Sequence, residues 1–98
     1  MTVRILSVAE QEFSDAVSHY NNESPGLGFE FAIEVNATIE RIKNNPNAWT
    51  LLSRRTRRCL TNRFPFGIIY EGRDDEILIV SVMHLHRHPE SWIGRTHG

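Results

Sequence analysis

Apolar residues recur at helical spacing through the first half of the chain. One stripe consists of Ala9, Phe13, Ala16, Val17 and Tyr20. A second stripe consists of Leu27, Phe31, Val35, Ile39 and Ile42. Side chains three or four positions apart share one face of an α-helix, so the pattern predicts two amphipathic helices. A short strand over residues 3–6 is expected to precede them.

Polar residues predict where these helices begin and end. Ser7 and Glu10 have the spacing of a capping box, which predicts a helix start at Ser7. Ser24 and Pro25 resemble an N-cap followed by proline at the first helical position, although the nearby glycines weaken that first turn. Asn45 followed by Pro46 is expected to end the second helix.

The second half of the chain has the alternation of β-strands. We expect strands over residues 58–61, 67–71 and 76–84, after a loop from Asn47 to about Thr56. Both alternating sets of residues 76–84 are largely apolar, so this strand should be central and covered on both faces. Two helices can cover only one face, which leaves the C-terminal segment, a second chain, or both for the other.

The order of these elements predicts a single α+β domain over residues 1–98. A short N-terminal strand and a helical hairpin should pack on one face of a mostly antiparallel sheet of about four strands. The sequence contains no run of the ~18 apolar residues that a membrane span requires. We therefore expect a soluble, cytoplasmic protein.

Phe29 and Ile33 project from the second helix on the side opposite its main stripe, with Ala37 beside them. Either the helix is sandwiched between the first helix and the sheet, or these residues await a partner.

Charge is divided unequally between the two halves of the chain. Residues 1–49 carry three Lys/Arg and seven Asp/Glu, whereas residues 50–98 carry eight and five, for a net charge of −1. Five arginines lie within ten positions that contain no acid: Arg54, Arg55, Arg57, Arg58 and Arg63. This run is either a solvated edge or a surface for an anionic partner, namely nucleic acid or the acidic tail of a protein.

Histidines are concentrated after the last predicted strand. His84, His86 and His88 would share one side of a continued strand, and such a triplet can bind zinc or nickel. Because Glu90 is the only nearby additional ligand, we favour polar or nucleic-acid-facing histidines and expect no metal and no cofactor. Trp92 is expected to anchor the C-terminal segment. Cys59, the only cysteine, is expected to be a buried thiol.

Four segments in this order are similar to the ParE/RelE superfamily of type II toxin–antitoxin toxins, the plasmid stabilisation proteins. They are residues 20–31, 45–49, 57–70 and 82–92, and the resemblance extends over roughly residues 3–92. It implies the α+β fold described above.

Resemblance to the RelE branch implies ribosome-dependent mRNA cleavage without a metal. In that case His84 or His86 would act as acid or base, while Arg58 and Arg87 would support the phosphate. Nucleases of the family often place a tyrosine near the C-terminus, but no tyrosine follows Tyr70 here.

The segments Ser24-Pro25-Gly26-Leu27-Gly28 and Arg63-Phe64-Pro65-Phe66 look closer to the ParE branch, which we favour. That branch implies a non-enzymatic poison of DNA gyrase, without sequence-specific DNA binding. The expected target-binding residues are His84, His86, Arg87, His88 and Trp92.

A type II toxin also implies a cognate antitoxin, whose disordered tail folds on the toxin. The expected antitoxin-binding residues are Phe29, Ile33, Arg57 and Arg58. A non-toxic binding module is the remaining alternative.

Overall fold

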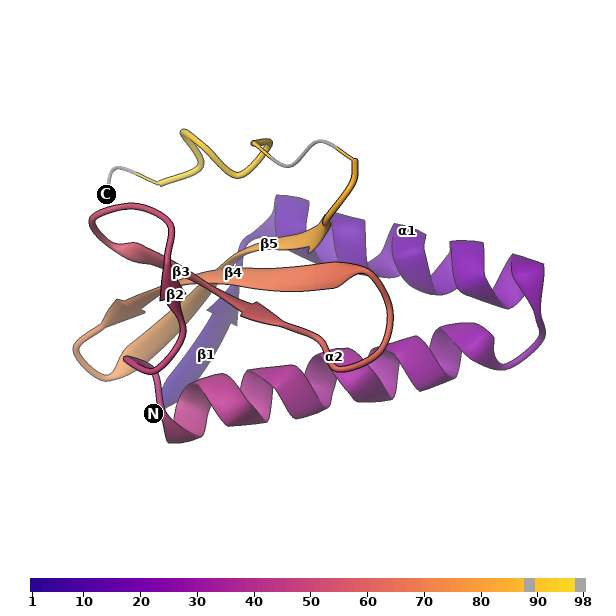
Figure 1. Ribbon diagram of the computed structural model, residues 1–98, viewed down its shortest axis with the longest axis horizontal. Helices are drawn as coiled ribbons and strands as arrows, with labels where there is room; N and C mark the ends of the chain where they lie inside the picture. The colour runs from indigo at the N-terminus through magenta and orange to yellow at the C-terminus, as the bar shows by residue number, and fades with distance from the viewer. Residues whose placement is uncertain (88–89, 97–98) are drawn as a thin grey trace.

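The computed structural model describes residues 1–87 and 90–96, and it confirms the predicted α+β class. The elements are β1 (Thr2–Ile5), α1 (Ser7–Glu23), α2 (Leu27–Asn44), β2 (Thr50–Leu51), β3 (Thr56–Leu60), β4 (Phe66–Arg73) and β5 (Glu76–His84). The sheet order is β1-β5-β4-β3-β2 (Figure 1). Only β1 runs parallel to its neighbour; the other pairs are antiparallel. β5, predicted to be central, lies between β1 and β4.

The sheet contains five strands rather than about four. The fifth is β2, a two-residue strand inside the segment that the sequence predicted as a loop. Thr50 pairs with Arg58 and Leu51 with Arg57, so a sharp reversal at residues 52–55 brings the chain back along β3. A strand this short has too few alternating positions to be recognised from its sequence.

Helix α1 begins at the predicted residue, but neither helix has the predicted cap. Ser7 is the first residue of α1, and Leu6 occupies the N-cap position without a side-chain hydrogen bond. Leu6 N–H donates to Ile79 O (3.0 Å), so the chain passes directly from the β1–β5 pairing into the helix. The second helix begins at Leu27 instead of Pro25, because Gly26 takes a left-handed conformation (φ 90°) before it.

Gly28 allows the two helices to approach closely at the hairpin. A Cβ at this position would lie 2.2 Å from Val17 O and 2.6 Å from Asn21 Cγ. The Gly28 N–H also donates to Asn21 Oδ1 (2.8 Å). The glycine that weakened the predicted helix start is therefore required for helix–helix packing.

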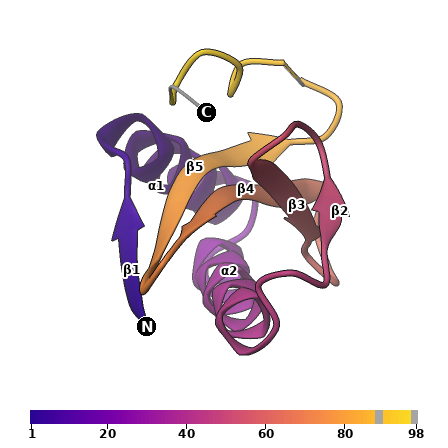
Figure 2. The same ribbon diagram turned by 90° about the vertical axis from the view of Figure 1, so that its left-hand side faces the viewer.

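The helical hairpin covers one face of the sheet, as predicted (Figure 2). Phe31, Val35 and Ile42 of α2 are buried with Ala9 and Ala16 of α1. Their partners on the sheet are Cys59, Phe66, Ile68, Tyr70, Ile77, Ile79 and Val82. Cys59 is buried, as predicted, and this burial raises the pKa of its thiol.

The C-terminal segment covers the opposite face, which was one of the possibilities left open by the sequence. Buried residues here are Ile69, Leu78, Val80 and Met83, and the partly buried residues packed on them are Leu6, Leu52, Leu85 and Trp92. Figure 2 shows residues 90–96 above the sheet and α2 below it. Trp92 therefore anchors the C-terminal segment, as expected.

A carboxylate from α1 closes the edge of β5 beyond the end of β1. Glu12 Oε1 accepts hydrogen bonds from Ser81 Oγ (2.9 Å) and Val82 N–H (3.2 Å). Arg95 binds the same carboxylate with both Nη atoms (2.8 and 3.2 Å) and also donates to Val80 O. This arrangement ties the C-terminal segment to the first helix. Among the described residues, no helix has the length and apolar character needed to cross a membrane.

Candidate functional site

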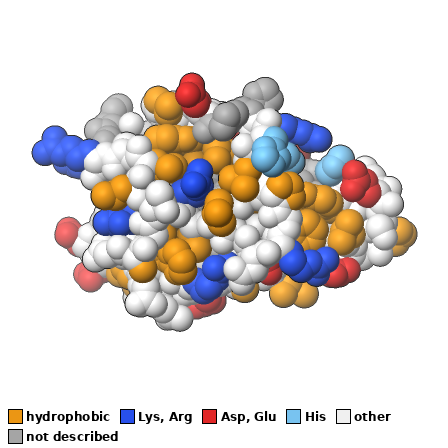
Figure 3. All heavy atoms as spheres, viewed as in Figure 1, with side chains coloured by type: hydrophobic (Ala, Val, Ile, Leu, Met, Phe, Trp, Pro, Cys, Tyr) orange, Lys and Arg blue, Asp and Glu red, His pale blue; other side chains and the backbone are white. Residues whose placement is uncertain are grey.

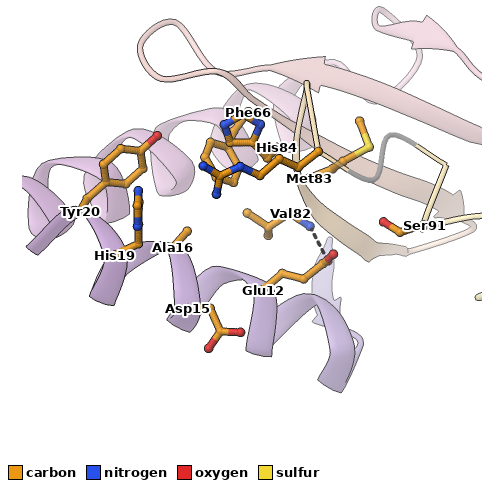
Figure 4. A pocket seen from close by; sticks show the side chains of 11 residues that line it. Glu12, Asp15, Ala16, His19, Tyr20, Phe66, Val82, Met83, His84 and Ser91 are labelled. Carbon is orange, nitrogen blue, oxygen red and sulfur yellow. Dashed lines mark hydrogen bonds between the residues drawn. The ribbon is translucent and has the colours of Figure 1, made fainter. Parts of the chain in front are cut away.

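A cleft of about 420 Å³ lies between the second half of α1 and the end of β5. Its floor is apolar and includes Ala16, Phe66 and Val82, and its rim includes His19, Tyr20, His84 and Arg87. Figure 4 shows His19 and Tyr20 of the helix facing His84 and Phe66 across the cleft, with Asp15 and Glu12 farther along the same helix. Figure 3 shows histidine side chains beside a cationic side chain, next to hydrophobic surface.

His84 is held in one orientation at the end of β5. Its ring packs edge-on against Phe66, with 5.1 Å between ring centroids. The His86 N–H donates to His84 Nδ1 (3.1 Å), which leaves Nε2 to carry the hydrogen of the neutral ring. Burial lowers the pKa of His84, and Arg87, His86 and His19 lower it further. The ring is therefore a neutral hydrogen-bond donor near pH 7.

Tyr20 was not among the predicted site residues, and neither was His19. Tyr20 packs its ring against Phe31 and Phe64 (5.2 and 4.8 Å between centroids) while lining the cleft. Burial raises the pKa of its phenol, Glu23 adds to that shift, and Arg87 opposes it. The sequence placed Tyr20 on the core-facing stripe, which is correct. The sequence contained no signal that the apolar stripe of α1 ends beside the last residues of β5.

The remaining exit residues do not form one surface. His86 and Arg87 are exposed, whereas Trp92 packs on the sheet face opposite the helices. His88 lies outside the described residues. Within those residues, no group of three or more His, Cys, Asp or Glu side chains is arranged to hold a metal ion.

The arginine run is divided between the two faces of the sheet. Arg57 pairs with Tyr70, which belongs to the helix-covered core, and Arg58 pairs with Ile69, which belongs to the opposite core. Arg57 Nη1 donates to Trp49 O (2.8 Å). The Arg58 stem passes over Gly67, where an added Cβ would lie 3.0 Å from Arg58 Cγ. Both arginines are half-buried, so their substitution would disturb packing as well as surface charge.

Arg54, Arg55 and Arg63 are the exposed members of the run. Arg63 already pairs with Glu30 of α2 (3.0 Å), and its guanidinium lies over the Phe64 ring. The five arginines therefore do not form a continuous basic stripe, because successive residues of a strand point to opposite faces.

Phe29 and Ile33 are exposed on the outer face of α2. Their exposed fractions are 65% and 70%, while Phe31 between them is fully buried. Of the two interpretations left open by the sequence, the sandwiched helix is therefore wrong. The outer face of α2 is uncovered in the isolated chain.

The chain has an α+β fold in which a helical hairpin covers one face of a five-stranded mixed sheet. Residues 3–89 match the family model described as ParE toxin of type II toxin–antitoxin system, parDE. The chain belongs to this family.

A solved structure described as the chromosomal ParDE TA system from P. aeruginosa has the same fold. Its TM-score is 0.75 at 15% sequence identity, over 86% of this chain and 95% of that chain. No curated protein matches the sequence.

Proposed function

We propose that this chain is the toxin of a type II module that poisons DNA gyrase and is neutralised by an antitoxin produced with it. Family membership supports the toxin class. The choice of gyrase over mRNA rests on one observation: Arg58 and His84 lie on opposite faces of the sheet. Arg58 is aligned with Ile69, on the sheet face that the C-terminal segment covers. His84 packs against Phe66, on the face that the helices cover.

A self-cleaving RNA phosphate needs its acid, base and cationic support around one reacting centre. The ribonuclease interpretation assigned these tasks to His84 or His86 together with Arg58 and Arg87. Arg58 and His84 start from opposite faces of the sheet, which argues against their acting together on one phosphate. The Nδ1 atom of His84 is also occupied by the His86 N–H, which removes its free lone pair as a base.

The proposed target-binding residues are His84, His86 and Arg87 at the exit from β5, together with Trp92; His88, the fifth predicted residue, lies outside the described residues. His86 and Arg87 present exposed side chains for contact with gyrase. Trp92 supports this surface by holding the C-terminal segment on the sheet.

The proposed antitoxin contact centres on Phe29 and Ile33. Two large, exposed apolar side chains one helical turn apart fit the apolar face of an amphipathic antitoxin segment. Arg57 and Arg58 would add contacts to antitoxin carboxylates through their guanidinium ends, with their stems remaining packed in the toxin. The contact should therefore weaken as the salt concentration rises.

Purified gyrase and supercoiled DNA test the target directly. We expect the wild-type protein to cause cleaved DNA to accumulate, and the double variant His86→Ala, Arg87→Ala to lose at least about tenfold in potency. The matched control is Arg54→Ala, Arg55→Ala, which removes two exposed arginines from the far end of the sheet. Shortening the chain after Met83 is a poorer test, because it also removes Trp92 and Arg95.

Ribosome-dependent mRNA cleavage by the wild-type protein, with gyrase unaffected, would replace this proposal with the RelE-like alternative. Inactivity in both the gyrase assay and the mRNA-cleavage assay would favour the alternative of a non-toxic binding module.

Binding of the co-purified antitoxin tests the second contact. Phe29→Ser should leave the toxin folded and weaken the complex by about 2 kcal/mol or more, because a buried interface aromatic contributes on that scale. Val8→Ser, which changes an exposed apolar residue near the start of α1, should leave binding unchanged. Equal binding by both variants would place the antitoxin elsewhere.

A further inference from the structure

The cleft between α1 and β5 has a positive end at Arg87. Within the described part of the chain, no carboxylate forms an ion pair with Arg87. His84 also lines this cleft, and its Nε2 hydrogen has no acceptor within residues 1–87 and 90–96. A guanidinium next to a neutral imidazole N–H provides both charge and directed hydrogen bonds for an anionic oxygen.

The acidic residues of the same cleft do not cancel this charge. Glu12 uses both carboxylate oxygens for Arg95, and one of them also for Ser81 and Val82. Asp15 lies on α1 about one turn after Glu12, and its Oδ1 accepts a hydrogen bond from Gln11 Nε2 (2.8 Å). Glu23 does not line the cleft, and it is paired with His19 at the rim (3.2 Å). The cleft therefore has a cationic end at Arg87 and a single lightly bonded carboxylate at Asp15.

Its floor and walls suit a flat, partly apolar group. The Tyr20 and Phe66 rings line it at 6.2 Å between centroids, and Ala16 and Val82 complete the floor. In the described residues, Tyr20 Oη makes no hydrogen bond. The cleft volume of about 420 Å³ is within the range of small-ligand sites.

We propose that this cleft binds one nucleotide unit, with the phosphate between Arg87 and His84 and the base against Tyr20 and Phe66. A sugar hydroxyl or base amino group can then donate to Asp15. Such a site recognises phosphate and a flat ring rather than a base sequence. The proposal does not depend on gyrase being the target.

Amide NMR of the intact protein, titrated with 5′-AMP, tests this site. We expect shifts concentrated at Ala16, His19, Tyr20, His84 and Arg87. Adenosine and inorganic phosphate should each bind at least about tenfold more weakly than the nucleotide, because each makes only one of the two contacts. Arg87→Gln should weaken 5′-AMP binding about tenfold or more, and Tyr20→Phe should weaken it less. The control Arg54→Gln should bind like the wild type.

Each variant is exposed or conservative, and its unperturbed amide spectrum serves as the check of folding. The proposal is overturned if 5′-AMP at about 10 mM shifts none of these amides, a limit that corresponds to negligible affinity. It is also overturned if inorganic phosphate binds as well as the nucleotide, which would indicate a simple anion site. Tighter binding of a capped acidic peptide, acetyl-Glu-Leu-amide, would assign the cleft to a protein segment instead.

Discussion

The two faces of the sheet are covered in different ways. On one face, two helices of 17 and 18 residues pack through an aromatic cluster centred on Phe31, whose ring centroid lies 4.7–6.1 Å from those of Phe13, Tyr20, Phe64 and Phe66. On the other face, irregular segments place Leu52, Leu85 and Trp92 over four buried strand residues.

This difference predicts which face of the sheet resists local unfolding. Local opening costs little free energy where few buried apolar contacts must be broken. We therefore expect the tail-covered face to open more readily than the helix-covered face. The Glu12–Arg95 contact compensates in part, because it ties the C-terminal segment to α1 and to β5.

Truncation of one aromatic residue on each face gives the largest expected effect. Phe31→Ala should lower the free energy of unfolding by about 3–5 kcal/mol, because it opens a cavity among packed rings. Trp92→Ala should cost about 2 kcal/mol, because this side chain is only partly buried. Urea denaturation measures both changes, with the exposed Phe29→Ala as a control expected within about 0.5 kcal/mol of the wild type. Equal losses at Phe31 and Trp92 would contradict the contrast between the faces.

Removal of the Glu12 charge should have a smaller effect. Glu12→Gln should destabilise the domain by about 1–3 kcal/mol, because hydrogen bonds from Arg95, Ser81 and Val82 depend on this carboxylate. Arg95→Gln should cost less, since Ser81 and Val82 keep their acceptor.

Hydrogen exchange distinguishes these two variants. The Val82 amide should exchange faster in Glu12→Gln than in Arg95→Gln, whereas the exposed Glu10→Gln should leave it unchanged. Identical Val82 exchange in Glu12→Gln and Arg95→Gln would show that the carboxylate does not cap this edge.

The smallest expected effect is a pH dependence at His84. Burial lowers the pKa of His84 below the ordinary value of 6.5, and Arg87, His86 and His19 contribute to the shift. The unfolded chain then binds more protons, so stability decreases as pH falls through about 6.5 toward the folded pKa. His84→Gln should lose less stability than the wild type between about pH 7.5 and 5.5. Parallel stability curves for the two proteins would rule out this contribution.

Periodicity allowed both helices and the three longest strands to be predicted from the sequence. Phe31, Val35 and Ile42 lie in the core because residues at these intervals share a helix face. The start of α1 at Ser7 was predicted correctly, but Leu6 rather than Ser7 occupies its N-cap position, and the predicted start of α2 at Ser24 and Pro25 was wrong. Leu6 is held by a backbone hydrogen bond to Ile79, and Gly26 alone takes the left-handed conformation before α2.

The candidate site was predicted only in part. His84, Arg87 and their position after the last strand followed from the sequence. Tyr20 and His19 were missed because they are more than 60 positions away and join the cleft only when α1 packs on β5. The sequence did not reveal that the arginine run is divided between two faces, because neighbouring strand residues face opposite sides of the sheet.

By itself, the sequence determined the α+β class, the helix and strand order, and the apolar character of both faces of β5. These properties follow from local periodicity, which each segment carries alone. Tertiary structure decided that residues 90–96 cover the second face, that Phe29 and Ile33 remain exposed, and that Tyr20 meets His84 across a cleft. Such contacts depend on which distant segments become neighbours. That choice is made by packing of the whole chain, because each apolar surface is buried only by the partner that fits it.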